Sequence, residues 1–276
     1  MTHNIDRTFW MTGRYGVMVH WFYGILMPEE GERAKTLDEA VDRFDLDAFL
    51  RDFKATGADW LIFTFGQNTG AYSSPNATID RFCGKGHCSR RDLVLEIATE
   101  VHRLGKRFIG YLPCEVAGNP SLHRGFAWNT QPGTDQAEFQ RRYLLAVEEW
   151  AERFGLLMDG WWFDGCYTWD IFHNRYMDWH AWFQASRAGN PNRAVAFNDG
   201  SFCIGITAPI TMEQDYLSGE AEVLVNGRIR LGRPETPQLR AMGASDGCRT
   251  EPLPTHLPDE RFVPGTRCQW HCLLPI

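Results

Sequence analysis

Short, wholly apolar runs alternate with amphipathic segments along the first two thirds of this chain of 276 residues. Five runs have the length of a buried strand, and they are 16–21, 60–65, 108–112, 160–164 and 194–198. Apolar residues recur at helical spacing between them, over 44–53, 93–104, 139–154 and 172–183. Ser89 is the expected N-cap of the second helix. Strands that are apolar throughout, rather than at alternate positions, indicate a parallel sheet covered by helices.

Two architectures satisfy this alternation, a doubly wound open sheet and a (β/α)8 barrel. No glycine-rich phosphate-binding loop follows the first run, Gly16–Trp21, so the main signature of a dinucleotide-binding open sheet is missing. Side chains suited to chemistry instead end the runs, and they are His20, Tyr111, Asp164, Asn198 and, in a sixth candidate strand, Asp215. In a barrel those strand ends meet at one face, where the active site lies. We therefore expect one α/β domain over residues 1–276 with a (β/α)8 TIM-barrel-like fold.

The C-terminal third fits this fold less well. Residues 210–215 are a candidate sixth strand and 267–271 a candidate seventh, but no eighth is evident. Only Asp199–Pro209 separates the fifth strand from the sixth, which is too short for a helix with two loops. Residues 227–250 lack periodicity and are expected to form a loop or an insertion. The barrel is therefore expected to be incomplete or distorted at its C-terminal end.

Composition excludes several classes of function. With 28 Lys+Arg against 35 Asp+Glu the net charge is −7, whereas a nucleic-acid binder needs a basic surface. No apolar run reaches the ~20 residues of a membrane span, and the N-terminus shows no apolar signal-peptide core, so a cytoplasmic protein is expected. The eight cysteines form no CxxC pair, and Cys268-x-x-His271-Cys272 lacks a second pair of ligands. We expect free thiols and no metal, and nothing in the sequence bears on the oligomeric state.

Carboxylates supply the candidate catalytic groups. Asp164 ends the hydrophobic run Trp161-Trp162-Phe163 and is followed by Gly165. A carboxylate fixed on a rigid strand under aromatic walls suits a nucleophile, although a helix cap or a turn aspartate has the same local pattern. Glu213, Asp215 and Glu220 are candidates for a partner acid. Two carboxyl groups ~5–5.5 Å apart indicate a retaining glycosidase, and ~6.5–9.5 Å an inverting one.

Sugar-binding residues are expected around this pair. The 11 tryptophans suit a site that stacks on sugar rings. His20 ends the first strand next to Trp21, and an imidazole both donates and accepts hydrogen bonds. Gln67 and Asn68 stand between two glycines after the second strand, and amides suit contacts to hydroxyls. Trp270 and His271, in the candidate seventh strand, are included in the predicted site.

Several motifs occur in the order found in the family-29 glycoside hydrolases, the α-L-fucosidases. The segment Arg14–Trp21 resembles the family's K/R-[FY]-G-[IL]-x-x-H-W start, Arg91–Val94 with Gly105–Tyr111 resembles its RD-[IL]-V…G-L-K-F-G-[LV]-Y stretch, and Trp162–Gly165 matches its W-F-D-G nucleophile motif. Phe44–Leu46 and Ala55–Ala58 are similar to its first helix and the following turn. The similarity runs from about Arg14 to Glu220.

The resemblance implies a retaining exo-glycosidase on a (β/α)8-like barrel, without a metal or organic cofactor, acting on a small glycoside or an oligosaccharide. It implies Asp164 as the nucleophile, His20 and Trp21 in the sugar pocket, and Tyr111 and Trp162 in its wall. Asp215-Tyr216-x-x-x-Glu220 is similar to a D-Y-E-T-P-E pattern of part of the family. Glu220 is therefore the first choice for the acid/base and Glu213 the second.

One loop departs from the family. Where its members have H-H-D-G-F after the second strand, this chain has Gly66-Gln67-Asn68-Thr69-Gly70. A changed set of donors and acceptors changes which sugar satisfies a buried polar site, so the predicted substrate is L-fucose or a related sugar. Family members also usually continue beyond this length. Two rival hypotheses are an inactive carbohydrate-binding barrel and a metal-dependent barrel hydrolase, although the latter needs a His-x-His pair where this chain has Val19-His20-Trp21.

Overall fold

A parallel sheet of five strands forms the centre of the computed structural model, which describes residues 5–23, 34–131, 135–166, 177–200 and 209–219 and the strand residues 224–225, 228–229 and 269–273. The strands are β1 (Gly16–His20), β2 (Trp60–Thr64), β3 (Arg107–Pro113), β4 (Gly160–Asp164) and β5 (Ala194–Phe197). Each pairs in parallel with the next along the chain. The five strands expected from the apolar runs are therefore confirmed.

The other edge of β1 carries a strand of opposite direction. β8 (Gln269–Leu273) pairs antiparallel with β1, with Gln269 opposite His20. Since the strands of a (β/α)8 barrel are all parallel, the expected seventh strand differs from a barrel strand in direction as well as in bounds. The part of the chain described here contains a six-stranded sheet in the order β5-β4-β3-β2-β1-β8, and no closed barrel.

The expected sixth strand at 210–215 is wrong, because these residues form turns. These residues contact β5 through the N–H of Asp215, which donates to Val195 O over 2.9 Å. A small hairpin of β6 (Leu224–Val225) and β7 (Arg228–Ile229) overlaps the start of the expected loop at 227–250, whose remaining residues lie outside the description.

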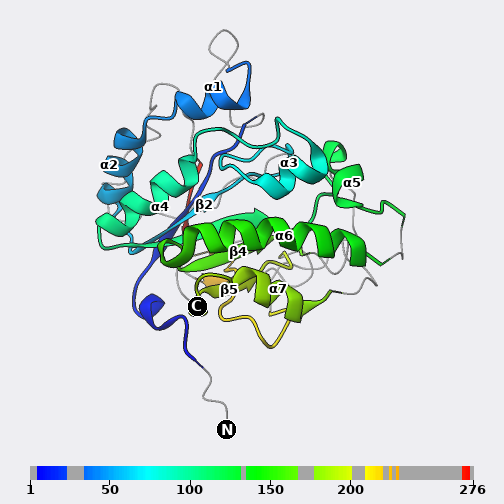
Figure 1. Ribbon diagram of the computed structural model, residues 1–276. Helices are drawn as coiled ribbons and strands as arrows, with labels where there is room; N and C mark the ends of the chain where they lie inside the picture. The colour runs from blue at the N-terminus through cyan, green and yellow to red at the C-terminus, as the bar shows by residue number, and fades with distance from the viewer. Residues whose placement is uncertain are drawn as a thin grey trace.

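Helices cover one face of the sheet, in front of the strands in Figure 1. The longer ones are α2 (Leu46–Thr56), α4 (Leu93–Arg103), α6 (Ala137–Phe154) and α7 (Trp179–Ser186). The short ones are α1 (Leu37–Asp42), α3 (Ala77–Cys83) and α5 (Pro120–Phe126), and the 3-10 turns are η1 (Phe9–Met11) and η2 (Gly155–Leu157). The predicted helix at 172–183 corresponds to α7, although 172–176 lie outside the description.

Aspartate side chains cap three of the long helices. Asp45 accepts from Ala48 N over 2.9 Å, and Asp178 from Ala181 N over 3.0 Å. Asp92, rather than the expected Ser89, caps α4 by accepting from Leu95 N over 3.2 Å. The prediction of Ser89 was wrong because both residue types satisfy a free N–H at a helix start, and only the observed start at Leu93 separates them.

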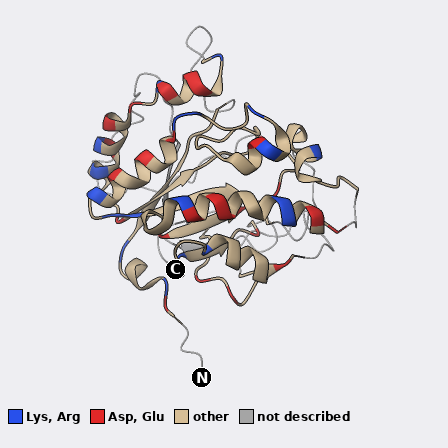
Figure 2. Cartoon of the chain, in the orientation of Figure 1, with Lys and Arg blue, Asp and Glu red and all other residues tan. Residues whose placement is uncertain are grey.

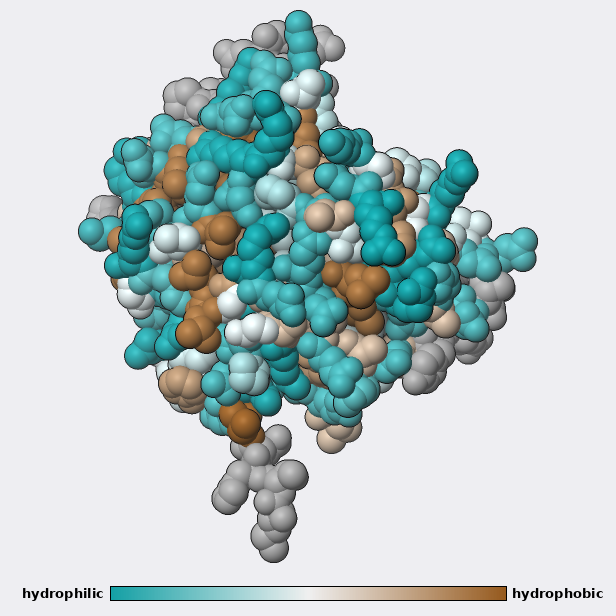
Figure 3. Space-filling view, in the orientation of Figure 1, coloured by the Kyte–Doolittle hydropathy of each residue, from teal (hydrophilic) through white to brown (hydrophobic). Residues whose placement is uncertain are grey.

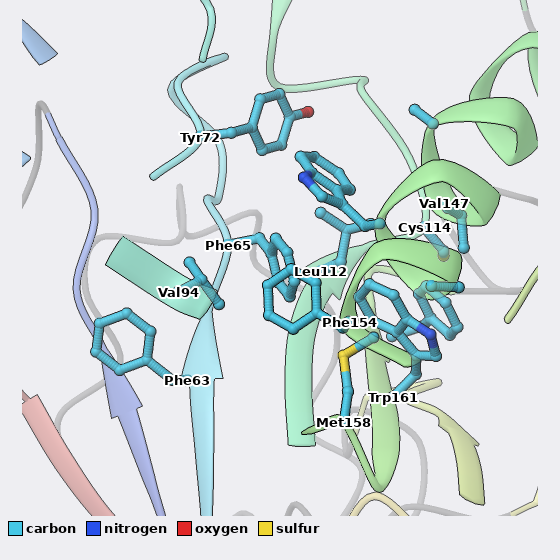
Figure 4. Packing of buried hydrophobic residues seen from close by; sticks show 14 of the residues in the cluster. Phe63, Phe65, Tyr72, Val94, Leu112, Cys114, Val147, Phe154, Met158 and Trp161 are labelled. Carbon is cyan, nitrogen blue, oxygen red and sulfur yellow. The ribbon is translucent and has the colours of Figure 1, made fainter. Parts of the chain in front are cut away.

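Each face of the sheet has its own apolar cluster. The helix-covered cluster is rich in aromatic rings, for example Phe65, Phe154 and Trp161, which Figure 4 shows packed together. Rings of Phe65 and Trp161 lie 5.2 Å apart. The second cluster lines the opposite face, which we call the inner face, and it consists of Trp10, Met11, Met18, Trp60, Ile62, Ile109, Tyr111, Trp162, Ala194 and Ala196.

The solvent side of the helices is polar. Lys, Arg, Asp and Glu alternate along the outer surface of α6 and the neighbouring helices (Figure 2). The space-filling view of this side is mostly hydrophilic, with small separated apolar patches (Figure 3). This pattern is that of a helical layer in contact with water, and it leaves the functional groups to be sought at the strand ends.

Candidate active site

The carboxyl ends of β1, β4 and β5 bring polar side chains to the inner face. Side chains of a strand alternate between the two faces. His20, Asp164 and Asn198 each lie two residues beyond a member of the inner cluster, and those members are Met18, Trp162 and Ala196. Because parallel strands end at the same edge, the three polar groups gather along one rim of the sheet.

Asp164 is held by groups from both neighbouring strands. The Tyr111 hydroxyl of β3 donates to Asp164 Oδ2, and the Asn198 amide donates from Nδ2 to Asp164 Oδ1 over 2.9 Å. The Asp164 residue itself is half-buried, whereas Tyr111 and Asn198 are buried. Each carboxylate oxygen therefore has a donor, and the carboxylate cannot rotate without breaking a hydrogen bond.

Two aromatic rings form a wall beside this carboxylate. Tyr111 and Trp162 are stacked with their centroids 5.2 Å apart and their planes 16° apart. Trp162 Nε1 donates to Ser218 O over 2.9 Å, which satisfies the indole of a buried residue. The stack fixes the ring of Tyr111, and its hydroxyl is thereby directed at Asp164.

His20 joins the same group from β1. Its ring lies 4.8 Å from the ring of Tyr111, and its Nδ1 lies 3.0 Å from Gln67 Oε1. Burial lowers the pKa of His20 from its usual 6.5, while the hydrogen bond to Gln67 and the charge of Asp164 act in the opposite direction. The imidazole is therefore neutral near pH 7, and the contact with Gln67 requires its proton on Nδ1.

The loops after β2 and β3 form the next part of the rim. Gln67 is half-buried and Asn68 is exposed. A Cβ built on Gly118 would lie 3.2 Å from Asn68 Cγ, so the two loops are in contact at this glycine. Asn68 thus presents an amide to solvent beside a loop that begins at the end of β3.

Two predicted site residues lie away from Asp164. Trp21 faces the helix layer, where its ring packs 5.2 Å from that of Phe44. Asp215 forms ion pairs with Arg187 over 2.8 Å and with Arg7 over 3.4 Å. It lies beside Val195 in the N-terminal half of β5, away from the strand end that carries Asn198. The structure gives Trp21 a packing role and Asp215 an anchoring role.

The candidate acid/base residues are placed differently. Glu220 lies outside the described residues, and Glu213 is exposed on the turn after Thr211. Trp270 and His271 belong to β8, whose backbone register places them opposite Val19 and Met18.

Two residues of this region were missed from the sequence. Ser218 is buried, and its hydroxyl donates to Asn198 Oδ1 over 3.0 Å. Glu115 is buried, and its Cγ would lie 2.9 Å from a Cβ built on Gly165, the residue after Asp164. Glu115 follows the end of β3, so the search for polar residues at strand ends finds it when extended by two positions. No local signal identifies Ser218.

Three further features were sought in the described residues: a surface hollow, a metal-binding group and a membrane-spanning helix. A shallow hollow of about 520 Å³ follows α5, between His123, Trp128 and Gln131, and contains none of the predicted site residues. In the described ranges, no three His, Cys, Asp or Glu side chains form a group that could hold a metal ion. None of the helices described is long and apolar enough to cross a membrane.

Comparison with solved structures relates this fold to glycoside hydrolases, while no protein-family profile and no curated protein matches the chain. The chain is similar to the endo-fucoidan hydrolase MfFcnA9 of glycoside hydrolase family 107, with 20% identity and a TM-score of 0.55 over 77% of this chain and 43% of that one. The family-107 endo-fucoidan hydrolase MfFcnA4 gives 20% identity and a TM-score of 0.56 over 77% and 36%.

The α-L-fucosidase AlfC from Lactobacillus casei gives 16% identity and a TM-score of 0.44 over 69% of this chain and 68% of that one. The chain spans less than half the length of the two fucoidan hydrolases. At these identities the likeness to the fucoidan hydrolases shows a shared fold alone.

Proposed function

We propose that this chain carries the catalytic part of a retaining glycoside hydrolase that cleaves an α-L-fucosidic or closely related bond. The observation that carries the proposal is the placement of Asp164. It ends a buried central strand, and donors from β3 and from the residue after β5 bind both of its oxygens. An attacking carboxylate needs such support from rigid elements, because its orientation toward the anomeric carbon decides the rate.

The proposed reaction is a double displacement. An oxygen of Asp164 forms a bond to C1 of the sugar while the bond from C1 to the leaving oxygen breaks, and that oxygen takes a proton from the acid/base. Water then gives a proton to the same acid/base and attacks C1. The ester to Asp164 breaks, and both the carboxylate and the configuration at C1 are restored.

Glu220 is the proposed acid/base, with Glu213 as the second choice. Support comes from Ser218, which contacts Asn198 beside Asp164 and precedes Glu220 by two residues. Glu220 is thus the candidate that stands nearest in sequence to a residue in contact with the Asp164 site. Glu213 stands five residues before Ser218 and is exposed, which makes it the weaker candidate.

The proposed sugar-binding groups are His20, Gln67 and Asn68, with Tyr111 and Trp162 as the wall. Neutral His20, whose Nδ1 proton faces Gln67, can accept through Nε2, and the two amides both donate and accept hydrogen bonds, as hydroxyl recognition requires. The motif resemblance favours exo cleavage of a terminal L-fucose. The structural likeness to two endo-fucoidan hydrolases favours an internal bond of a fucose polymer.

The test replaces Asp164. With an activated aryl α-L-fucoside and with fucoidan as substrates, we expect Asp164→Asn and Asp164→Gly to abolish turnover, and azide to restore part of it in the glycine variant as the fucosyl azide. Asp92→Asn is the matched control. It replaces another half-buried, hydrogen-bonded aspartate and retains an N-cap.

Each result decides between hypotheses. Release of fucose from the aryl substrate alone supports the exo mode, and shortening of the polymer supports the endo mode. Turnover by Asp164→Asn at the rate of the unmodified protein would exclude Asp164 as the nucleophile. Binding of these sugars without any hydrolysis would favour the inactive carbohydrate-binding barrel instead.

A further inference from the structure

Ser218 links the two sides of the Asp164 site. Its hydroxyl donates to Asn198 Oδ1 over 3.0 Å, and its carbonyl accepts from Trp162 Nε1 over 2.9 Å. The residue is 3% exposed. Ser218 thus contacts both the Asn198 amide that binds Asp164 and the Trp162 indole that is stacked on Tyr111.

The contacts of Asn198 define which way its amide faces. Gly200 N–H donates to Asn198 Oδ1 over 3.1 Å, and a backbone N–H has no other role than donor. With Oδ1 on that side, the Ser218 hydroxyl is its second donor and Nδ2 faces Asp164 Oδ1. A reversed amide would direct its oxygen at a carboxylate oxygen and leave Asp164 Oδ1 without this donor.

The segment that carries Ser218 is fixed along the sheet. The Tyr216 hydroxyl donates to Trp161 O over 2.8 Å. Asp215 binds Val195 through its backbone N–H and through its carboxylate. These contacts hold the backbone of 215–218 against β4 and β5, so the position of the Ser218 hydroxyl follows from the fold rather than from a mobile side chain.

We infer that Ser218 is a positioning residue, whose hydroxyl orients the Asn198 amide and thereby holds the Asp164 carboxylate for attack. This role rests on the proposed glycosidase function. In this role Ser218 acts on the proposed nucleophile indirectly, through the amide of Asn198.

The test compares Ser218→Ala with Ser186→Ala in the full chain, with an activated aryl α-L-fucoside and with fucoidan. Ser186 is the matched control because it is also buried and its hydroxyl also makes one hydrogen bond, to Trp182 O over 2.6 Å within α7. Loss of one neutral hydrogen bond predicts a roughly 3- to 10-fold fall in kcat for Ser218→Ala, with KM nearly unchanged.

The pH profile separates positioning from a general structural effect. A carboxylate that loses support for its charged form is protonated more readily, so the acid limb of kcat/KM should move to higher pH in Ser218→Ala. It should stay in place in Ser186→Ala, and Ser218→Thr, which keeps a hydroxyl, should return it toward its original position. Should Ser218→Ala fail to fold, Ser218→Cys keeps the volume with a weaker donor and should move the limb in the same direction.

The outcomes are distinct. An acid limb and kcat equal to those of the unmodified protein in both Ser218→Ala and Ser218→Cys would overturn the role of Ser218 and leave the glycosidase proposal intact. Equal shifts in Ser218→Ala and Ser186→Ala would overturn it as well. An unmodified protein without turnover on either substrate would refute the proposed function and, with it, this role.

Discussion

Gln67 Oε1 lies 3.0 Å from His20 Nδ1, which ties the loop after β2 to the end of β1. The loop 66–70, which differs from that of the family-29 glycoside hydrolases, is therefore in contact with His20, which belongs to the motif resembling the start of that family. A change of the amide to a carboxylate at position 67 would place a negative charge beside the His20 imidazole.

We expect Gln67→Glu to raise the pKa of His20 relative to that in the unmodified protein, because a carboxylate at hydrogen-bond distance stabilises the imidazolium against the effect of burial. An NMR titration of the His20 ring measures this directly. Asn68→Asp is the matched control, since it adds the same charge one residue further along, in the exposed position. Equal responses of His20 to both variants would contradict a specific contact with Gln67.

Tyr111→Phe should lower kcat by roughly 10-fold while the protein keeps its stability within about 1.5 kcal/mol. The variant removes the hydroxyl that donates to Asp164 and retains the ring stacked on Trp162. Steady-state kinetics and urea unfolding give the two quantities. Tyr15→Phe removes a hydroxyl bound to Thr56 O, before β1, and should leave kcat unchanged. A Tyr111→Phe enzyme as active as the unmodified one would show that this donor is unnecessary for the reaction.

Arg193→Met should lower the free energy of unfolding by about 3 kcal/mol or more. Arg193 is fully buried, and its guanidinium donates to carbonyls of Ala151, Gly155, Met158, Ser186 and Ala188. Burial lowers its pKa to about 10, so it stays charged at neutral pH. Arg193→Lys should also be destabilised, because an ammonium has only three donors.

Urea unfolding followed by circular dichroism measures this loss. Arg141→Met is the control for a surface arginine, whose ion pair with Glu138 is exposed and contributes little. Comparable stability of the Arg193 and Arg141 variants would mean that water replaces the guanidinium at the five carbonyls.

Asp159 should make stability depend on pH in the acid range. Burial acts to raise its pKa, but the hydrogen bonds from His102, Phe108 N and Arg107 outweigh it and lower the pKa below 3.8. A carboxyl with a lowered pKa in the folded state stabilises the fold fully above 3.8, and this contribution is lost as the pH falls through the folded-state value.

Unfolding of the unmodified protein and of Asp159→Asn between pH 3 and pH 6 tests this expectation. The difference in unfolding free energy should be largest at the upper end and should shrink below about pH 4. A difference that stays constant over this range would indicate that Asp159 contributes by shape alone.

The sheet was predictable because its signal is local. The runs at 16–21, 60–65 and 160–164 are apolar throughout and end in polar or aromatic residues, and each became a parallel strand. The direction of β8 was not predictable, since it depends on pairing with β1 about 250 residues earlier. The short helices α3 and α5 extend over too few residues to show a periodicity.

The gathering of polar side chains at one rim of the sheet was predictable where each side chain stands at a strand end. Asp164, Tyr111, Asn198 and His20 were predicted in this way, and the structure places them side by side, while their catalytic and binding roles stay predictions. The alternation of strand side chains explains why Trp21, next to His20, faces the helices. Ser218 depends on a loop that returns to β4 and β5, and no residue near it in sequence indicates that contact.

Asp215 makes strand-like contacts with β5, although residues 210–215 form turns and bends. Its N–H donates to Val195 O and its carboxylate accepts from Val195 N, both over 2.9 Å. One residue, through its backbone N–H and its carboxylate, thereby makes the pair of hydrogen bonds that a neighbouring strand normally supplies. Unsatisfied groups along an outer strand are a template for pairing with another molecule and for aggregation. At Val195 both backbone groups on this edge of β5 are bound by Asp215, so this position offers no free group for pairing with another molecule.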